Sequence, residues 1–201
     1  AGFAAENASG VPLNAPNRNY KDDNHKPELM AALSEFWLLH GFRAPASMIN
    51  ILQEIPELYF LLALFKKDDY KALYQSVMEM SAGEVKERLQ PLLDRIIPLY
   101  QADRLSKNSP DFWAARAALT FNEQGEIDRG IFSVYLLNLV KMNMGEAIFQ
   151  DAGILHAYLE GQNIEIMANS DNVLRGGLTP KYIDVPELMK HVCFEPVIPH
   201  I

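Results

Sequence analysis

Hydrophobic positions between residues 45 and 121 recur at the spacing of amphipathic helices. The clearest stripe follows the i, i+3, i+4, i+7, i+8 series and consists of Tyr70, Leu73, Tyr74, Val77 and Met78. Residues 57–65 are apolar almost all round, which predicts a buried helix. The whole stretch therefore predicts a compact all-α module of about five helices.

Several of these predicted helices carry recognisable signals at their ends or inside them. Asp68 can cap the helix that carries the stripe, and Ser81 with Glu84 has the spacing of a capping box. Pro91 and Pro98 fall inside the helix that follows Ser81, and we expect them to kink or divide it.

After a turn predicted at 122–126, the pattern changes to short segments separated by glycine-containing turns. Residues 131–140 are rich in β-branched, aromatic and aliphatic side chains. The plausible strands are Glu146 to Phe149, Ala157 to Leu159, Ile164 to Met167 and Val192 to Glu195. Pro186 to Lys190 is expected to form a short helical turn. Turns about ten residues apart are typical of an antiparallel sandwich or barrel.

The first 42 residues are harder to interpret. Residues 1–20 read as loop and turn, since Asn, Gly and Pro cluster there with little periodicity. In 27–42, the apolar positions fit helical spacing, but a strand would place Lys26, Glu28 and Met30 on one face. Local propensity slightly favours a helix, and the pattern alone leaves both alternatives open.

These segments predict a mixed α and β architecture. Residues 1–43 and 123–195 are expected to be parts of one β-domain, and 44–122 to be an all-α domain inserted into it. Residues 196–201 would begin a linker or a further domain. The sequence starts at Ala1 rather than Met and stops without a capping signal, so we expect a fragment of a longer protein.

Composition removes several classes of function. The chain has 201 residues, a formal net charge of -8 and a pI near 5.1, which argues against nucleic-acid binding. Its apolar runs are far shorter than the ~20 residues that span a bilayer, so no membrane association is expected. The single cysteine, Cys193, excludes an intrachain disulfide and fits a cytoplasmic protein.

Candidate chemistry lies in three polar stretches. Residues 19–28 hold lysines, a histidine and carboxylates directly before an apolar run. His156 with Tyr158 forms the second stretch, and 169–181 forms the third. Imidazole and carboxylate ligands suit zinc, while arginine and lysine suit an anionic, phosphorylated substrate. Each stretch also has an ordinary interpretation: a hydrogen-bonded histidine, a carboxylate in a first helical turn, a surface turn, or solvated cations.

The same three stretches resemble the signatures of type I mannose-6-phosphate isomerases. They run from Asn19 to Glu28, from His156 to Gly161 and from Glu165 to Lys181, in the order found in that family. The similarity extends over residues 2–195 and is loosest in the helical module.

The resemblance implies a fold and an activity. The family is built on cupin-type antiparallel β-domains (jelly rolls) interrupted by an inserted all-α helical domain, so 27–33 and 35–42 would be strands. Its members are zinc-dependent isomerases that interconvert mannose 6-phosphate and fructose 6-phosphate through a cis-enediol. We accordingly expect a hexose 6-phosphate substrate, a zinc cofactor and a monomer.

The resemblance also assigns roles to residues. Glu28 and His156 resemble two of four zinc ligands, and Arg175 resembles the active-site arginine. The positions expected to line the same pocket are Lys26, Tyr158, Glu165, Asp171 and Lys181. The general base could be Glu165, Asp171, Lys26 or Lys181, and the sequence does not choose among them.

The chain departs from the family pattern in one respect. The other two ligands belong to a Gln-x-His-Pro motif that the family carries upstream of the position of Phe3, and this motif is not in the chain. We therefore expect the isolated chain to be inactive. The alternative function is a non-catalytic cupin remnant or helical interaction module that has lost the metal site.

Overall fold

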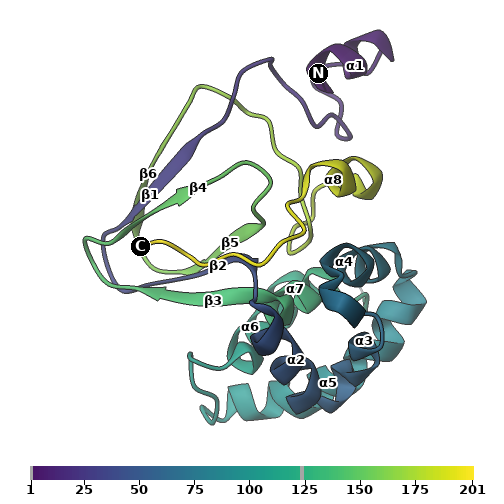
Figure 1. The fold of residues 1–201 in the computed structure, drawn as a ribbon, viewed down its shortest axis with the longest axis vertical. Coiled ribbons are helices and arrows are strands. Elements are labelled where there is room, and N and C mark those ends of the chain that lie inside the picture. The colour runs from purple at the N-terminus through teal and green to yellow at the C-terminus, as the bar shows by residue number, and fades with distance from the viewer. Residues whose placement is uncertain (1, 123–124) are drawn as a thin grey trace.

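The computed structural model describes residues 2–122 and 125–201 and contains helices and strands in two regions (Figure 1). The helices are α1 (Gly2–Ala8), α2 (Pro45–Glu54), α3 (Tyr59–Leu62), α4 (Tyr70–Glu79), α5 (Ala82–Gln101), α6 (Pro110–Phe121), α7 (Gly130–Leu136) and α8 (Val185–His191), with 3-10 turns at Pro56–Leu58 and Lys66–Asp68. The strands are β1 (Glu28–Ala32), β2 (Phe36–Phe42), β3 (Leu137–Met142), β4 (Ala147–Gln150), β5 (His156–Glu160) and β6 (Asn163–Met167). The mixed α and β class predicted from the sequence is confirmed.

The strands form two antiparallel three-stranded sheets with the orders β4-β1-β6 and β3-β2-β5. Within the first sheet, Glu28 pairs with Gln150 on one side and with Met167 on the other. Within the second, His40 pairs with His156. The two strands implied for 27–42 by the family resemblance are therefore present, as β1 and β2.

The two sheets pack face to face over a small apolar core, as expected for a cupin-type β-domain. Successive side chains of a strand alternate between its faces, so every second residue points inward. The buried members of this core are Met30, Ala32, Phe36, Leu38, Val140, Met142 and Ile148. The core fills one part of the space between the sheets, and polar side chains occupy the same inner face farther along the strands.

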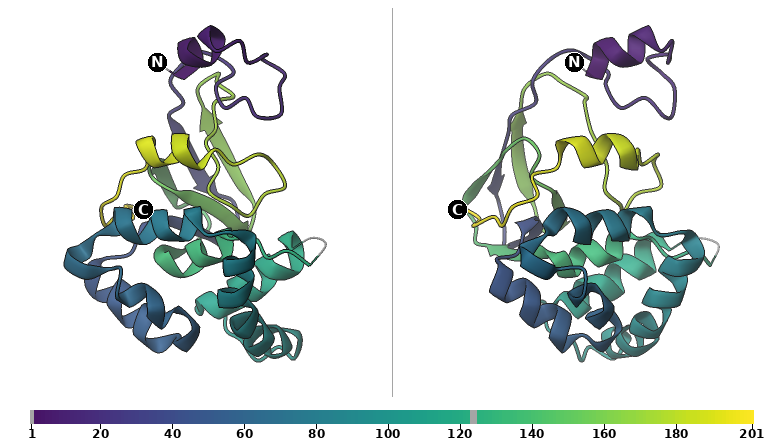
Figure 2. Two further views of the ribbon diagram at one scale, coloured as in Figure 1. Left: turned by 90° about the vertical axis from the view of Figure 1, so that its right-hand side faces the viewer. Right: turned by 45° about the vertical axis from the view of Figure 1, so that its right-hand side comes forward.

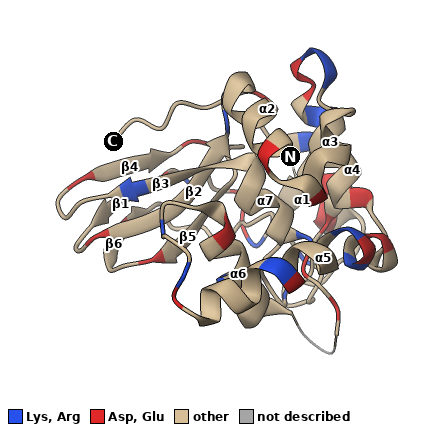
Figure 3. Ribbon diagram, turned by 90° about the horizontal axis from the view of Figure 1, so that it is seen from below, with Lys and Arg blue, Asp and Glu red and all other residues tan. Residues whose placement is uncertain are grey.

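The opposite face of β2 packs against the helices, so this strand is buried along its whole length. Trp37, Leu39 and Phe42 belong to the large core that α2 to α7 enclose. Figure 1 shows these helices gathered at one side of the sheets, and both views of Figure 2 show α8 lying across the top of the helix cluster. Acidic and basic residues are interspersed over the helices (Figure 3).

The helical predictions hold with local corrections. The capping box at Ser81 is formed. Asp69, not Asp68, caps α4, and its side chain accepts a hydrogen bond from the Ala72 amide. Pro91 and Pro98 do not divide α5, which is assigned as one 20-residue helix.

Other predictions were wrong in detail. Residues 57–65 form only a short turn and α3, and Tyr59 is 60% exposed, so this segment is not buried on all sides. Residues 2–8 are helical rather than loop, and 130–136 form α7 despite their β-favouring composition. Val192 to Glu195 is not a strand; the nearby backbone makes only an isolated bridge between Phe42 and Pro196.

The turn predicted at 122–126 includes residues 123 and 124, which lie outside the described residues, as does the predicted domain boundary at 123. Across the described ranges, no helix is both long enough and apolar enough to traverse a lipid bilayer.

Candidate functional site

Glu28 and His156 face each other across the two sheets. Glu28 begins β1 and shares the inner face with Met30, whereas His156 begins β5 and shares the inner face with Tyr158. The distance between Glu28 Oε2 and His156 Nε2 is 3.5 Å. Lys26 Nζ lies 3.0 Å from the other oxygen of the same carboxylate, Glu28 Oε1.

The orientation of the His156 ring follows from its second nitrogen. Nδ1 lies 2.9 Å from the Ile154 carbonyl oxygen. A carbonyl can only accept a hydrogen bond, so Nδ1 carries a proton, and Nε2 is the ring nitrogen that faces Glu28. A histidine that ligates zinc is held in the same way, by a backbone carbonyl at its other nitrogen. The donors of Glu28 and His156 therefore fit a divalent cation between them.

These two residues alone do not make a metal site. Within the described ranges, no group of three or more His, Cys, Asp and Glu side chains is arranged to hold a metal ion. A structural or catalytic zinc takes at least three protein ligands. A complete site would thus need at least one further ligand beside this pair.

Tyr158 and Glu165 form a second polar pair on the inner face. The Tyr158 hydroxyl donates a 2.6 Å hydrogen bond to Glu165 Oε1. Burial, together with the Glu165 carboxylate, raises the pKa of Tyr158 well above its usual value of 10.0. Tyr158 is therefore neutral at physiological pH and remains a hydrogen-bond donor.

A cavity of about 790 Å³ opens beside these groups. Its lining contains six of the eight residues singled out from the sequence: Lys26, Glu28, His156, Tyr158, Glu165 and Arg175. The other two, Asp171 and Lys181, are exposed and are not among the described residues that line it. Within the described ranges, the Arg175 guanidinium makes no hydrogen bond or ion pair, so it is free to contact a ligand.

Hydrogen bonds between Asp22 and the 170–172 loop join the first and third polar stretches. Asn172 Oδ1 accepts from the backbone amides of Lys21 at 2.7 Å and of Asp22 at 3.2 Å. The Asp22 carboxylate accepts from the Ser170 hydroxyl at 2.8 Å and from the Asp171 amide at 2.9 Å. The hydrogen bond from the Asp171 amide is the main cause that lowers the pKa of Asp22. This network holds the segment before Glu28 against the segment before Arg175.

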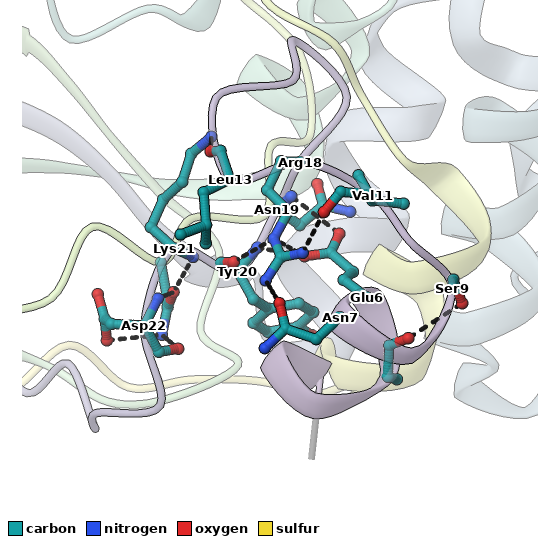
Figure 4. A network of polar contacts seen from close by, with 12 residues as sticks. Glu6, Asn7, Ser9, Val11, Leu13, Arg18, Asn19, Tyr20, Lys21 and Asp22 are labelled. Carbon is teal, nitrogen blue, oxygen red and sulfur yellow. Dashed lines mark hydrogen bonds and ion pairs between the residues drawn. The ribbon is translucent and has the colours of Figure 1, made fainter.

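The N-terminal segment is organised around Arg18, a residue that the sequence analysis did not single out (Figure 4). Its guanidinium is 2.9 Å from Glu6 Oε2 and donates to the Val11 carbonyl at 2.7 Å and to Asn7 Oδ1 at 2.8 Å. Tyr20 continues the segment and donates from its hydroxyl to Glu187 in α8 at 2.9 Å. These contacts bring Tyr20 to the rim of the cavity.

Two buried polar side chains, His40 and Gln150, were also missed. Both are at least 95% buried, and neither makes a side-chain hydrogen bond to any described residue. Gln150 lies opposite Glu28 in the sheet and lines the cavity. Burial lowers the pKa of His40, so this ring is neutral at physiological pH. The sequence signal that could have identified them is a single polar residue at an inward-facing position of an otherwise apolar strand.

Comparisons with known proteins find the same family that the three polar stretches resemble. The model of the family "Phosphomannose isomerase type I, catalytic domain" matches residues 5–45. Mannose-6-phosphate isomerase of Salmonella typhimurium is 43% identical over 97% of the chain, and that of Homo sapiens is 36% identical over 95%. The chain spans 48% of each of these relatives, about half their length.

Solved structures of mannose 6-phosphate isomerase also match nearly the whole chain. The zinc-bound form of mannose 6-phosphate isomerase matches 98% of the chain with a TM-score of 0.73 and 41% identity. The Salmonella typhimurium enzyme bound to fructose 6-phosphate (f6p) and zinc matches 98% with a TM-score of 0.74 and 40% identity. In both cases, the chain covers 48% of the solved structure. Over nearly its whole length, and in both sequence and fold, this chain is therefore similar to about half of a type I phosphomannose isomerase.

Proposed function

We propose that the protein is a zinc-dependent aldose–ketose isomerase that interconverts mannose 6-phosphate and fructose 6-phosphate. The observation that carries this proposal is the pair Glu28 and His156, whose facing donor atoms are 3.5 Å apart at the edge of a large cavity. Relatives at 36–43% identity bear the name of this isomerase, and one related structure holds zinc and fructose 6-phosphate.

Glu28 and His156 would supply two of the zinc ligands. The Ile154 carbonyl fixes the imidazole with Nε2 toward the metal position, and Lys26 stays close to the far oxygen of Glu28. A bound zinc ion would act as a Lewis acid and polarise a substrate oxygen. The remaining ligands, a glutamine and a histidine in the family pattern, would come from outside residues 1–201.

The reaction requires a base that moves a proton between C1 and C2 of the open-chain sugar. In the forward direction, the base removes the C2 proton while the C1 carbonyl oxygen gains a proton, which gives a cis-enediol. Return of a proton to C1, with loss of a proton from the C2 hydroxyl, gives the ketose. Glu165 is our preferred base because it lines the cavity as an acceptor for Tyr158.

The other candidates for the base are supported less well. Lys26 also lines the cavity, but its ammonium is held beside Glu28. Asp171 and Lys181 are exposed away from the lining. We assign Lys26 to binding anionic oxygens of the substrate, because a charged ammonium next to the reacting centre attracts them.

Arg175 would stabilise the charge that develops on the enediolate. Its guanidinium has no partner among the described residues, and it lines the same cavity as Glu165. A positioned cation is worth more in the transition state than in the ground state, because the oxygen charge grows as the proton leaves.

Isomerisation in D₂O tests the proton transfer. The full-length protein should incorporate deuterium at C2 of mannose 6-phosphate and at C1 of fructose 6-phosphate after repeated turnover. Glu165→Gln should lower turnover by about 10²–10⁴-fold while zinc content holds, and exposed Glu126→Gln serves as the control. Isomerisation with no deuterium at either carbon would contradict the cis-enediol route.

A further inference from the structure

Arg175 is followed by a loop whose position depends on the helices rather than on the sheets. The Arg175 side chain makes no hydrogen bond or ion pair to the described residues. The position of its guanidinium is therefore determined by the backbone that carries it. The backbone after Arg175 runs through Gly176, Gly177, Leu178 and Thr179. The contacts of these four residues therefore decide where the arginine stands.

The first contacts are backbone against backbone. Gly177 has a φ of +135°, and a Cβ atom built on it would lie 2.5 Å from the Cα of Gly130, the first residue of α7. A Cβ built on Gly130 would lie 2.6 Å from the Leu178 nitrogen. Only two glycines allow the loop and the start of α7 to approach this closely.

The loop is also bounded by α4. A Cβ atom on Gly176 would lie 2.7 Å from the hydroxyl oxygen of Tyr74, which is buried in the helical core. The segment after Arg175 thus contacts two helices, α4 and α7.

One carboxylate connects the loop to the start of α7. Asp128 Oδ1 accepts from the Gly130 amide at 2.7 Å and from the Leu178 amide at 3.0 Å. Asp128 Oδ2 accepts from the Thr179 amide at 3.3 Å. Leu178 itself has a φ of +52°, which a leucine adopts only where its surroundings hold it.

We propose that Asp128 is a positioning residue for Arg175. Its carboxylate fastens the loop that follows the arginine to the start of α7, so that the guanidinium stands at the cavity when substrate binds. This inference rests on the proposed function for the role of Arg175, while the attachment of the loop stands on the hydrogen bonds alone. The helical region would then contribute to catalysis, because the start of α7 holds the loop that follows Arg175.

The test uses two variants of Asp128 in the full-length protein. Asp128→Ala removes all three hydrogen bonds, and it should lower kcat by about tenfold to a hundredfold while KM and zinc content change little. Asp128→Asn can keep the oxygen that binds Gly130 and Leu178, so it should restore most of the turnover. Asp69→Ala removes a comparable hydrogen bond at the start of α4 and is the matched control.

Two further measurements separate positioning from a general loss of stability. In an Arg175→Ala background, Asp128→Ala should cost less than about threefold, because the group that it positions is gone. Hydrogen exchange over residues 175–182 should accelerate in Asp128→Ala and stay unchanged in Asp69→Ala. Equal losses of turnover in both backgrounds, or unchanged exchange, would overturn the proposal. A wild-type protein without isomerase activity would refute the proposed function, and exchange would still decide whether Asp128 holds the loop.

Discussion

Glu28 Oε2 lies 3.5 Å from His156 Nε2, although the two residues belong to different sheets. The imidazole cannot turn away, because its Nδ1–H is bound to the Ile154 carbonyl. Its Nε2 then faces a carboxylate oxygen, and a cation between the two atoms would stabilise this arrangement. The metal chemistry proposed here starts from this relationship.

Substitution of either residue should release zinc. Glu28→Gln keeps the size of the side chain but removes its charge, and His156→Asn removes the imidazole. Each should weaken zinc binding by more than the 10–100-fold that loss of an outer hydrogen-bond partner costs. Elemental analysis after dialysis measures this, with exposed Glu126→Gln as the control. Full zinc retention in both variants would remove them from the ligand set.

Arg175→Ala should affect turnover and not metal binding. Loss of one cation that stabilises transition-state charge typically costs about 10²–10³-fold in kcat. Zinc content should hold, because the guanidinium is not a ligand. Arg104→Ala, at an exposed position in the helical region, provides the comparison. Unchanged turnover in Arg175→Ala would refute its assignment.

Acid should weaken the attachment of the N-terminal segment to α8. Lys190, with hydrogen bonds from Tyr20 and His191, lowers the pKa of Glu187 from 4.5 to about 2. Because the folded-state pKa is the lower one, the contribution of Glu187 is complete above pH 4.5 and is lost as the pH falls toward 2. Glu187→Gln should thus lower the free energy of unfolding at pH 7 by about 1 kcal/mol or less, because solvent screens the ion pair with the exposed Lys190.

Urea unfolding of both proteins at several pH values checks this expectation. The difference between wild type and Glu187→Gln should shrink between pH 4.5 and pH 2. A difference that stays constant over that range would mean that the ionised carboxylate contributes nothing.

Asn138 should be essential to the junction between β2 and the residues near 197. Its Nδ2 atom lies within hydrogen-bonding distance of the His40, Gly41, Phe42 and Val197 carbonyls, at 3.0–3.2 Å. Asn138→Ala removes this donor from the junction and should lower the free energy of unfolding by about 1–3 kcal/mol. Asn138→Asp should cost more, because an ionised carboxylate cannot donate. Thermal unfolding measures both, and an equal effect of exposed Asn108→Ala would contradict this role.

Much of the helical region could be predicted from the sequence because α4 and α5 are amphipathic, and because α4, α5 and α6 each begin at a capping side chain. The two strands in 27–42 could not be predicted from the local pattern. β2 is buried on both faces, which replaces the alternation of a strand with a continuous apolar run. In β1, Leu29 is 41% exposed on the outer face, so apolar residues occupy both sides there too. The family resemblance supplied the correct assignment.

The site was predictable only in part, because its residues come from distant segments. No local spacing joins Glu28 to His156 or Asp22 to Asn172, and only the fold brings them together. Asp128 carried no signal because its partners are backbone amides. The domain limits, the site roles, the monomeric state and the cytoplasmic location stay predictions.

The most direct test of the proposed function is the zinc content of the full-length protein, measured by elemental analysis together with conversion of mannose 6-phosphate to fructose 6-phosphate. We predict close to one zinc ion per chain and an activity that is lost on chelation and restored by added zinc. A full-length protein with neither zinc nor turnover would contradict the account and leave the cavity a non-catalytic remnant.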